Sequence, residues 1–193
     1  MRILEQIVGV LNERLQNGVL SSSYFQKGNW NTLAYLTNPT DDSPQKPYTV
    51  ENGVTKDVII DDRYSFNIYH RIIDAFFNPA NTFGDGNGVI SMVCNMYAVV
   101  YADQNRTNYS PADMALAVSS GLNYTLTRSD LGNSKILSVK ASVVRANLNS
   151  SQVFLGEYGK GGHNPMQLTD VMIGIGYQLE ITAHSSCLDC STC

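Results

Sequence analysis

Hydrophobic and polar residues alternate strictly over the last long apolar segment of the chain. The apolar positions of this segment are Val171, Ile173, Ile175, Tyr177, Leu179 and Ile181. Side chains of a β-strand point alternately to its two faces, so this spacing predicts a long strand with one buried face. The same spacing at Leu137, Val139, Ala141 and Val143 predicts an earlier strand.

Two further segments have the composition of strands. Residues 56–73 contain apolar residues at every second position, which predicts one or two strands there. Residues 89–101 are almost continuously apolar. That composition is typical of a strand covered on both faces, and we expect one here.

Two segments have helical patterns. The apolar residues Ile3, Leu4, Ile7, Val8, Leu11 and Leu15 recur at helical spacing, and Asn17-Gly18 is a favourable helix end. A second helix is predicted to begin at Ser110 and end near Gly121. Ser110 can cap it, Pro111 suits the first helical position, and the helix dipole favours Asp113 in the first turn.

This order of elements predicts an α+β fold with a mainly antiparallel sheet, an N-terminal helix and a second helix packed on the sheet. The length suits a single domain over residues 1–193. Long loops are predicted near residues 37–50, which are rich in proline and aspartate, and near 156–165, which are rich in glycine. Residues 184–193 form a cysteine-containing C-terminal tail.

The composition favours protein contacts over nucleic-acid binding. The net charge is -4, and charged residues make up only 16% of the chain, below the ~25% of ordinary domains. A chain of this charge is unsuited to general binding of phosphate backbones, whereas its 11 tyrosines suit protein interfaces. Glu5, Glu13 and Arg14 stand where a signal peptide would be apolar, so we expect a cytosolic product without a membrane partner.

The tail is the one candidate metal site in the sequence. His184, Cys187, Cys190 and Cys193 are three residues apart, a spacing at which zinc or part of an iron–sulfur cluster can bind. A structural zinc site usually takes a second pair of ligands from elsewhere, and none is evident. Disulfides between neighbouring subunits are a further alternative. We favour a flexible or packing role, with no metal and no cofactor.

No catalytic residues are predicted. The segment Gly156–Gly162 lacks the spacing of a phosphate-binding loop. The adjacent carboxylates Asp61 and Asp62 would point to opposite faces of a strand and form no acid–base pair. His70 alternates in phase with apolar neighbours, which predicts a semi-buried, hydrogen-bonded histidine. We therefore expect a protein that is not an enzyme.

Three segments, together with the N-terminal amphipathic helix, carry a resemblance to a known family. They are DVIIDDRYSFNIYHRIID (57–74), SPADMALAV (110–118) and GYQLEITAHSSCLDC (176–190). In the order of its elements the chain resembles the head-to-tail connector and tail-terminator ring proteins of tailed bacteriophages. Its low charge and many Asn and Tyr residues are similar to those of virion proteins of crAss-like phages.

The resemblance implies a structural virion protein of the neck or tail, assembled in the host bacterial cytoplasm. It implies a homo-oligomeric ring, six- or twelve-fold, that contacts portal, connector or tail proteins. DNA would be a transient, non-specific partner that passes through the ring. The alternatives are another tail or baseplate binding module and, third, a small metal-dependent enzyme that uses the terminal cysteines.

Overall fold

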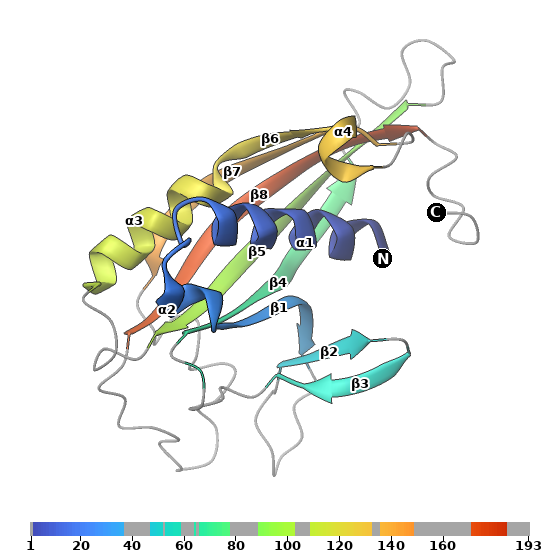
Figure 1. Cartoon of the computed structure of the whole chain (residues 1–193). Helices are drawn as coiled ribbons and strands as arrows, with labels where there is room; N and C mark the ends of the chain where they lie inside the picture. Colours follow the sequence, from blue (N-terminus) through green and yellow to red (C-terminus); the bar gives the residue numbers. More distant parts are fainter. Residues whose placement is uncertain are drawn as a thin grey trace.

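One mixed sheet organises the protein (Figure 1). The computed structural model describes residues 2–36, 47–51, 53–58, 64, 66–77, 89–102, 109–132, 136–148 and 171–184. The strands are β1 (Asn29–Leu36), β2 (Pro47–Glu51), β3 (Val54–Asp57), β4 (Phe66–Phe77), β5 (Val89–Ala102), β6 (Tyr124–Thr127), β7 (Ile136–Leu148) and β8 (Val171–His184). The helices are α1 (Arg2–Asn17), α2 (Ser23–Gln26), α3 (Pro111–Leu122) and α4 (Arg128–Leu131).

The eight strands lie in the order β3-β2-β1-β4-β5-β8-β7-β6. All neighbouring pairs are antiparallel except β1 and β4, which are parallel. The prediction of an α+β fold with a mainly antiparallel sheet, an N-terminal helix and a second helix is therefore confirmed. Helices α1 and α3 cross the same face of the sheet, which gives the molecule two layers (Figure 1).

The longest ladder joins β5 and β8, which pair from Val89 opposite His184 to Ala102 opposite Val171. The alternation predicted for β8 is confirmed, because Ile173, Ile175, Tyr177, Leu179 and Ile181 are all buried in the main core. That core also contains the apolar faces of α1 and α3. Burial of these side chains on one face supplies the main hydrophobic stabilisation of the layer.

Strand β5 is covered on both faces, as its composition predicts. Met96, Ala98 and Val100 point into the main core beneath the helices. Val99 points to the other face, where it is buried in a smaller cluster with Ala34, Val58 and Tyr69.

Both predicted helix boundaries are confirmed. Helix α3 begins with a capping box, in which the Ser110 hydroxyl accepts from the Asp113 backbone N–H and the Asp113 carboxylate accepts from the Ser110 backbone N–H. The two satisfied N–H groups would otherwise lack partners in the first turn. Helices α1 and α3 approach closely at Gly121, where an added Cβ would overlap the Leu15 side chain.

The loop predicted near residues 37–50 is wrong at its C-terminal end. Residues 47–51 form β2, which pairs with β1 and with β3. Residues 37–46 lie outside the described part of the chain. The proline and aspartate residues dominated the prediction, whereas Asn52-Gly53 between two β-branched segments is the pattern of a tight hairpin. Gly53 has φ of +79°, a left-handed conformation that glycine adopts without strain.

Candidate interaction surfaces and a buried polar chain

Of the candidate metal ligands in the C-terminal tail, only His184 lies within the described residues. His184 ends β8 opposite Val89, so it belongs to the sheet and not to the tail. Cys187, Cys190 and Cys193 lie outside the described residues, as do Gly156–Gly162 and residues 61–62. Within the described part, no group of three or more His, Cys, Asp or Glu side chains is placed to hold a metal ion.

A chain of polar side chains runs through the main core. His70 on β4 is fully buried, and its Nδ1 lies 2.8 Å from the Tyr177 hydroxyl on β8. Its Nε2 lies 2.8 Å from Oδ1 of Asn12 on α1. The Nδ2 of Asn12 then donates to the Asn31 carbonyl oxygen on β1, at 3.0 Å. These contacts link three strands and a helix that are distant in sequence.

The last hydrogen bond of this series determines where its protons lie. The Asn31 carbonyl oxygen can only accept, so the Asn12 amide must turn its nitrogen toward it and its oxygen toward His70. Nε2 of His70 therefore carries the ring proton, and Nδ1 accepts from the Tyr177 hydroxyl. Every polar atom that His70 buries is thus satisfied in the neutral imidazole.

The electrostatics favour a structural role for these groups. Burial lowers the pKa of His70 to about 3, so the ring is neutral near pH 7. Burial also raises the pKa of Tyr177 above its ordinary value, with a smaller contribution from Cys94. The prediction of a hydrogen-bonded histidine is confirmed, but His70 is fully buried and not semi-buried. A fully buried ring cannot reach a substrate, so His70 does not serve as a general base.

The sheet face opposite the helices carries a polar row. Asn95 Nδ2 on β5 donates to the Asp74 carboxylate on β4 at 2.6 Å. Gln178 Nε2 on β8 donates to Asn95 Oδ1 at 3.0 Å. In the adjacent row Glu180 stands opposite Lys140 in the register of β8 and β7. These rows are polar and of mixed charge, whereas the Val99 cluster on the same face is apolar.

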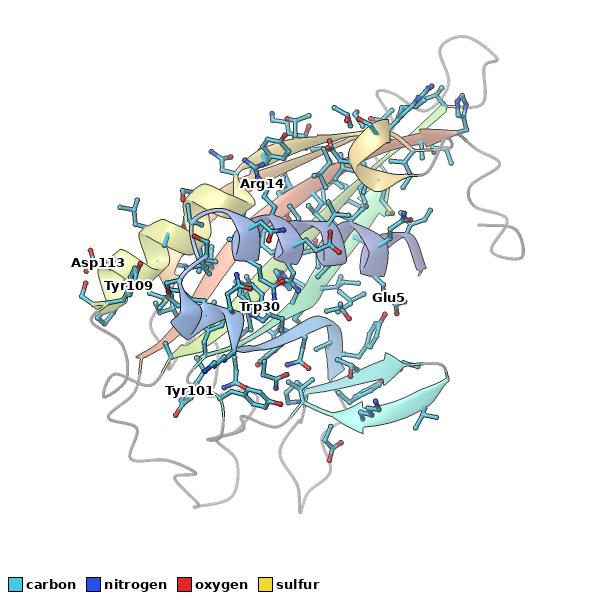
Figure 2. The ribbon with its side chains drawn as sticks, in the orientation of Figure 1. Glu5, Arg14, Trp30, Tyr101, Tyr109 and Asp113 are labelled. Atoms are coloured by element: carbon cyan, nitrogen blue, oxygen red, sulfur yellow. The ribbon has the colours of Figure 1, made fainter. Side chains whose placement is uncertain are left out.

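Helix α1 carries charged side chains near both ends, and one of them contacts the sheet (Figure 2). Arg14 near its C-terminal end stacks on the Tyr124 ring of β6, with 3.4 Å between the guanidinium carbon and the ring centroid. Glu5 near its other end lies on the β2 side of the molecule, where burial and, to a smaller extent, Glu5 and Tyr48 raise the pKa of Tyr35. The Arg14–Tyr124 contact therefore joins the C-terminal end of α1 to β6.

Both edges of the sheet are exposed: strand β3 at one side, and at the other the part of β7 beyond β6. Strand β3 is exposed at all four positions, on both of its faces. Strand β6 pairs with β7 only from Ser138 to Ala141. Beyond that point Val144, Arg145 and Ala146 of β7 are exposed, and no described strand lies outside them.

Apolar side chains are exposed close to both edges. Val144 on β7 and Leu116 on α3, the helix that packs on β7 and β8, are each 71% exposed. At the other edge Val54 of β3 is 59% exposed. These are single exposed side chains on separate elements, so the sheet edges and not an apolar patch mark the candidate surfaces.

Comparisons of the sequence with family models and curated proteins found no relative. No protein-family model matches the chain, and no curated protein sequence matches it. No helix in the described ranges is long and apolar enough to span a membrane.

Sequence reasoning located His70 but missed its partners. Tyr177 and His70 both lie in the buried phase of their own strands, and a polar group in that phase needs a hydrogen-bonding partner. The strand order that brings them together is set by pairing between distant segments. The edges were missed for the same reason, since their exposure depends on which strand lies beside which.

Proposed function

We propose that this chain is a structural subunit of a homo-oligomeric ring in the neck or tail of a tailed bacteriophage. In the proposal it acts as a head-to-tail connector or a tail terminator, by assembly and without catalysis. The ring joins head and tail and lets DNA pass without sequence-specific contacts. Its location would be the virion, after assembly in the host bacterial cytoplasm.

The observation that carries the proposal is the pair of exposed sheet edges. A closed ring requires two different patches on each subunit, one for each neighbour. Strand β3 and the exposed part of β7 lie at opposite sides of a single sheet and differ in sequence, so they meet this requirement. Exposed edges of this kind must be covered or protected in a stable protein, and pairing with a neighbouring subunit covers them.

The charge of the surface is compatible with the same proposal. The net charge of -4 gives no general attraction to the phosphates of DNA, as a channel through which DNA slides requires. The neutral, hydrogen-bonded core chain around His70 offers no reactive group at the surface. Its role in the proposal is to fix the central strands of the sheet against α1.

The first test is native mass spectrometry of the purified protein over a concentration series, with mass and bound metal read together. The proposal predicts a six- or twelve-fold species without stoichiometric metal. A monomer that carries zinc or iron, lost on Cys187→Ser substitution, would instead favour the metal-dependent enzyme.

The second test uses a phage that encodes the chain. Disruption of the gene should yield filled heads and completed tails that do not join, visible by electron microscopy. Normal joining without the protein would contradict the connector and terminator roles.

A further inference from the structure

The hydrogen-bonding groups of β3 point in known directions. Val58 N–H donates to the Pro47 carbonyl oxygen at 2.9 Å, so residues 47 and 58 form a hydrogen-bonded pair. Hydrogen-bonded and non-hydrogen-bonded pairs alternate along an antiparallel ladder. Tyr48 opposite Asp57 and Val50 opposite Thr55 are therefore non-hydrogen-bonded pairs. The backbone N–H and C=O groups of Thr55 and Asp57 consequently point away from β2, toward the outer edge.

The other edge, at β7, has an unpaired stretch among the described strands that is long enough for β3. Strand β6 occupies the outer side of β7 for four residues and then ends. From Ser142 onward β7 continues for seven residues with no outer neighbour among the described strands. A further four-residue strand can therefore lie beside β7 in line with β6. Strand β3 has that length.

We propose that β3 of one copy adds as a strand to the outer edge of β7, within residues 142–148, of a second copy. This inference rests on the proposed homo-oligomer and names the surfaces through which its subunits meet. The backbone groups of Thr55 and Asp57 supply hydrogen bonds, and strand addition of this kind is a recurring mode of recognition. Val54 and Val144 would lose much of their exposure in the contact.

Charge and shape favour this pairing over pairing of β7 with itself. Strand β3 carries Lys56 and Asp57, and the exposed part of β7 carries Arg145, so Asp57 gives the unlike edges one opposite charge to place beside Arg145. Two β7 edges would bring Arg145 near its own copy. The register of β7 with β8 also shifts between Val143 and Arg145, which leaves Val144 as an extra residue. A bulge of this kind twists an edge and disfavours long self-pairing.

The geometry makes the contact head-to-tail. Six strand spacings separate β3 from β7, so the two edges lie about 29 Å apart along the sheet order, on opposite sides of the sheet. Each copy therefore offers one edge to each of two neighbours, and the chain of contacts closes into a ring when the rotation per subunit allows it. The projecting β2–β3 hairpin would gain support, because a two-stranded ribbon alone is marginally stable in water.

Cysteine cross-linking between two differently labelled proteins tests the pairing. The background carries Cys187→Ser, Cys190→Ser and Cys193→Ser, and Cys94 stays because it is buried. One protein carries Thr55→Cys or Lys56→Cys. The other carries Val144→Cys, Arg145→Cys or Ala146→Cys, so that both faces of each edge are sampled. Oxidation should give disulfide-linked dimers in the mixtures and not in either protein alone.

A backbone substitution provides an independent readout. Thr55→Pro removes the outward N–H of β3 but no hydrogen bond of the hairpin, whereas Thr55→Ala removes the side chain and keeps the N–H. Thr55→Pro should raise the apparent Kd for association about tenfold, the effect of about one lost backbone hydrogen bond. Thr55→Ala should leave it within about twofold, since that hydrogen bond remains.

The outcomes separate this inference from the proposed function. Rings that form without mixed cross-links, or with links between two Thr55→Cys chains, would overturn the edge pairing and leave the ring proposal standing. A protein that stays monomeric at every concentration and forms no cross-link would contradict both. Mixed cross-links together with weaker association of Thr55→Pro would support both.

Discussion

The Tyr177 hydroxyl on β8 donates to Nδ1 of His70 on β4, although β5 lies between these two strands. Ala98 of β5 is the direct cross-strand neighbour of His70. Its methyl group leaves room for the two larger side chains to meet above it. The contact continues through Asn12 to the Asn31 carbonyl oxygen, so that a helix and three strands share one hydrogen-bonded chain.

Removing the hydroxyl of Tyr177 should destabilise the folded protein. Tyr177→Phe leaves Nδ1 of the fully buried His70 ring without its donor, which should lower the free energy of unfolding by about 1–3 kcal/mol. Urea denaturation measures the change. Tyr124→Phe is the matched control, because the Tyr124 ring beneath Arg14 would be retained, and it should change the stability little. Equal stability of Tyr177→Phe and the parent protein would show that the Tyr177–His70 hydrogen bond does not stabilise the fold.

Protonation of His70 should couple stability to pH. Its pKa is about 3 in the folded protein and ordinarily 6.5, so the unfolded state binds a proton that the folded state excludes. The contribution of His70 is complete above about pH 6.5 and is lost progressively as the pH falls toward 3. The slope reaches about 1.4 kcal/mol per pH unit within that window.

The measurement is the free energy of unfolding from pH 7 down to pH 4, for the parent protein and for His70→Gln. Carboxylates titrate in both proteins, so the difference between the two curves isolates the histidine. The parent protein should lose its advantage over the variant as the pH falls. Parallel curves would contradict the low pKa of His70.

The contact between α1 and α3 should reverse the usual effect of a glycine substitution. An added Cβ at Gly121 would overlap Leu15, whereas at Gly9 nothing lies within 4 Å of an added Cβ. Gly9→Ala should therefore stabilise the protein by roughly 0.5–1 kcal/mol through helix propensity. Gly121→Ala should destabilise it, because the two helices must separate or Leu15 must move. Thermal unfolding of both variants gives the comparison, and equal gains from both would rule out the close approach.

The C-terminal cysteines are predicted to be unnecessary for assembly. A variant with Cys187, Cys190 and Cys193 all replaced by Ser should form the same oligomer as the parent protein, before and after treatment with a metal chelator. Native mass spectrometry measures both. Dissociation on chelation in the parent protein alone would assign the tail a structural metal and overturn the prediction.

Local features of the fold were predictable because they depend on neighbouring residues. The alternation in β8, the near-continuous apolar run of β5 and the Ser110–Asp113 cap each follow from spacing along the chain. The burial phase of His70 was also readable in this way. The hairpin at Gly53 had a recognisable turn signal, but nearby prolines outweighed it.

Relationships across the fold were not predictable in the same way. The parallel pairing of β1 with β4, the close approach of Gly121 to Leu15 and the choice of Asn12 as the partner of His70 all depend on tertiary packing. Residues that meet there are far apart in sequence, and a single chain carries no signal of which distant segments pair. The candidate surfaces share this property, since an edge exists only once the strand order is fixed.

The parallel junction between β1 and β4 has a mechanical consequence. Its register shifts between Trp30 and Leu33, whereas β5 and β8 pair without interruption along their whole length. The ladder between β1 and β4 is therefore less regular than the ladder between β5 and β8. We expect its amide hydrogens to exchange sooner than those of β5 and β8. The β2–β3 hairpin is joined to β1 only at Tyr35 and Leu36 among the described pairs, so it can adjust its angle to the curvature of an assembly while the layer behind it stays rigid.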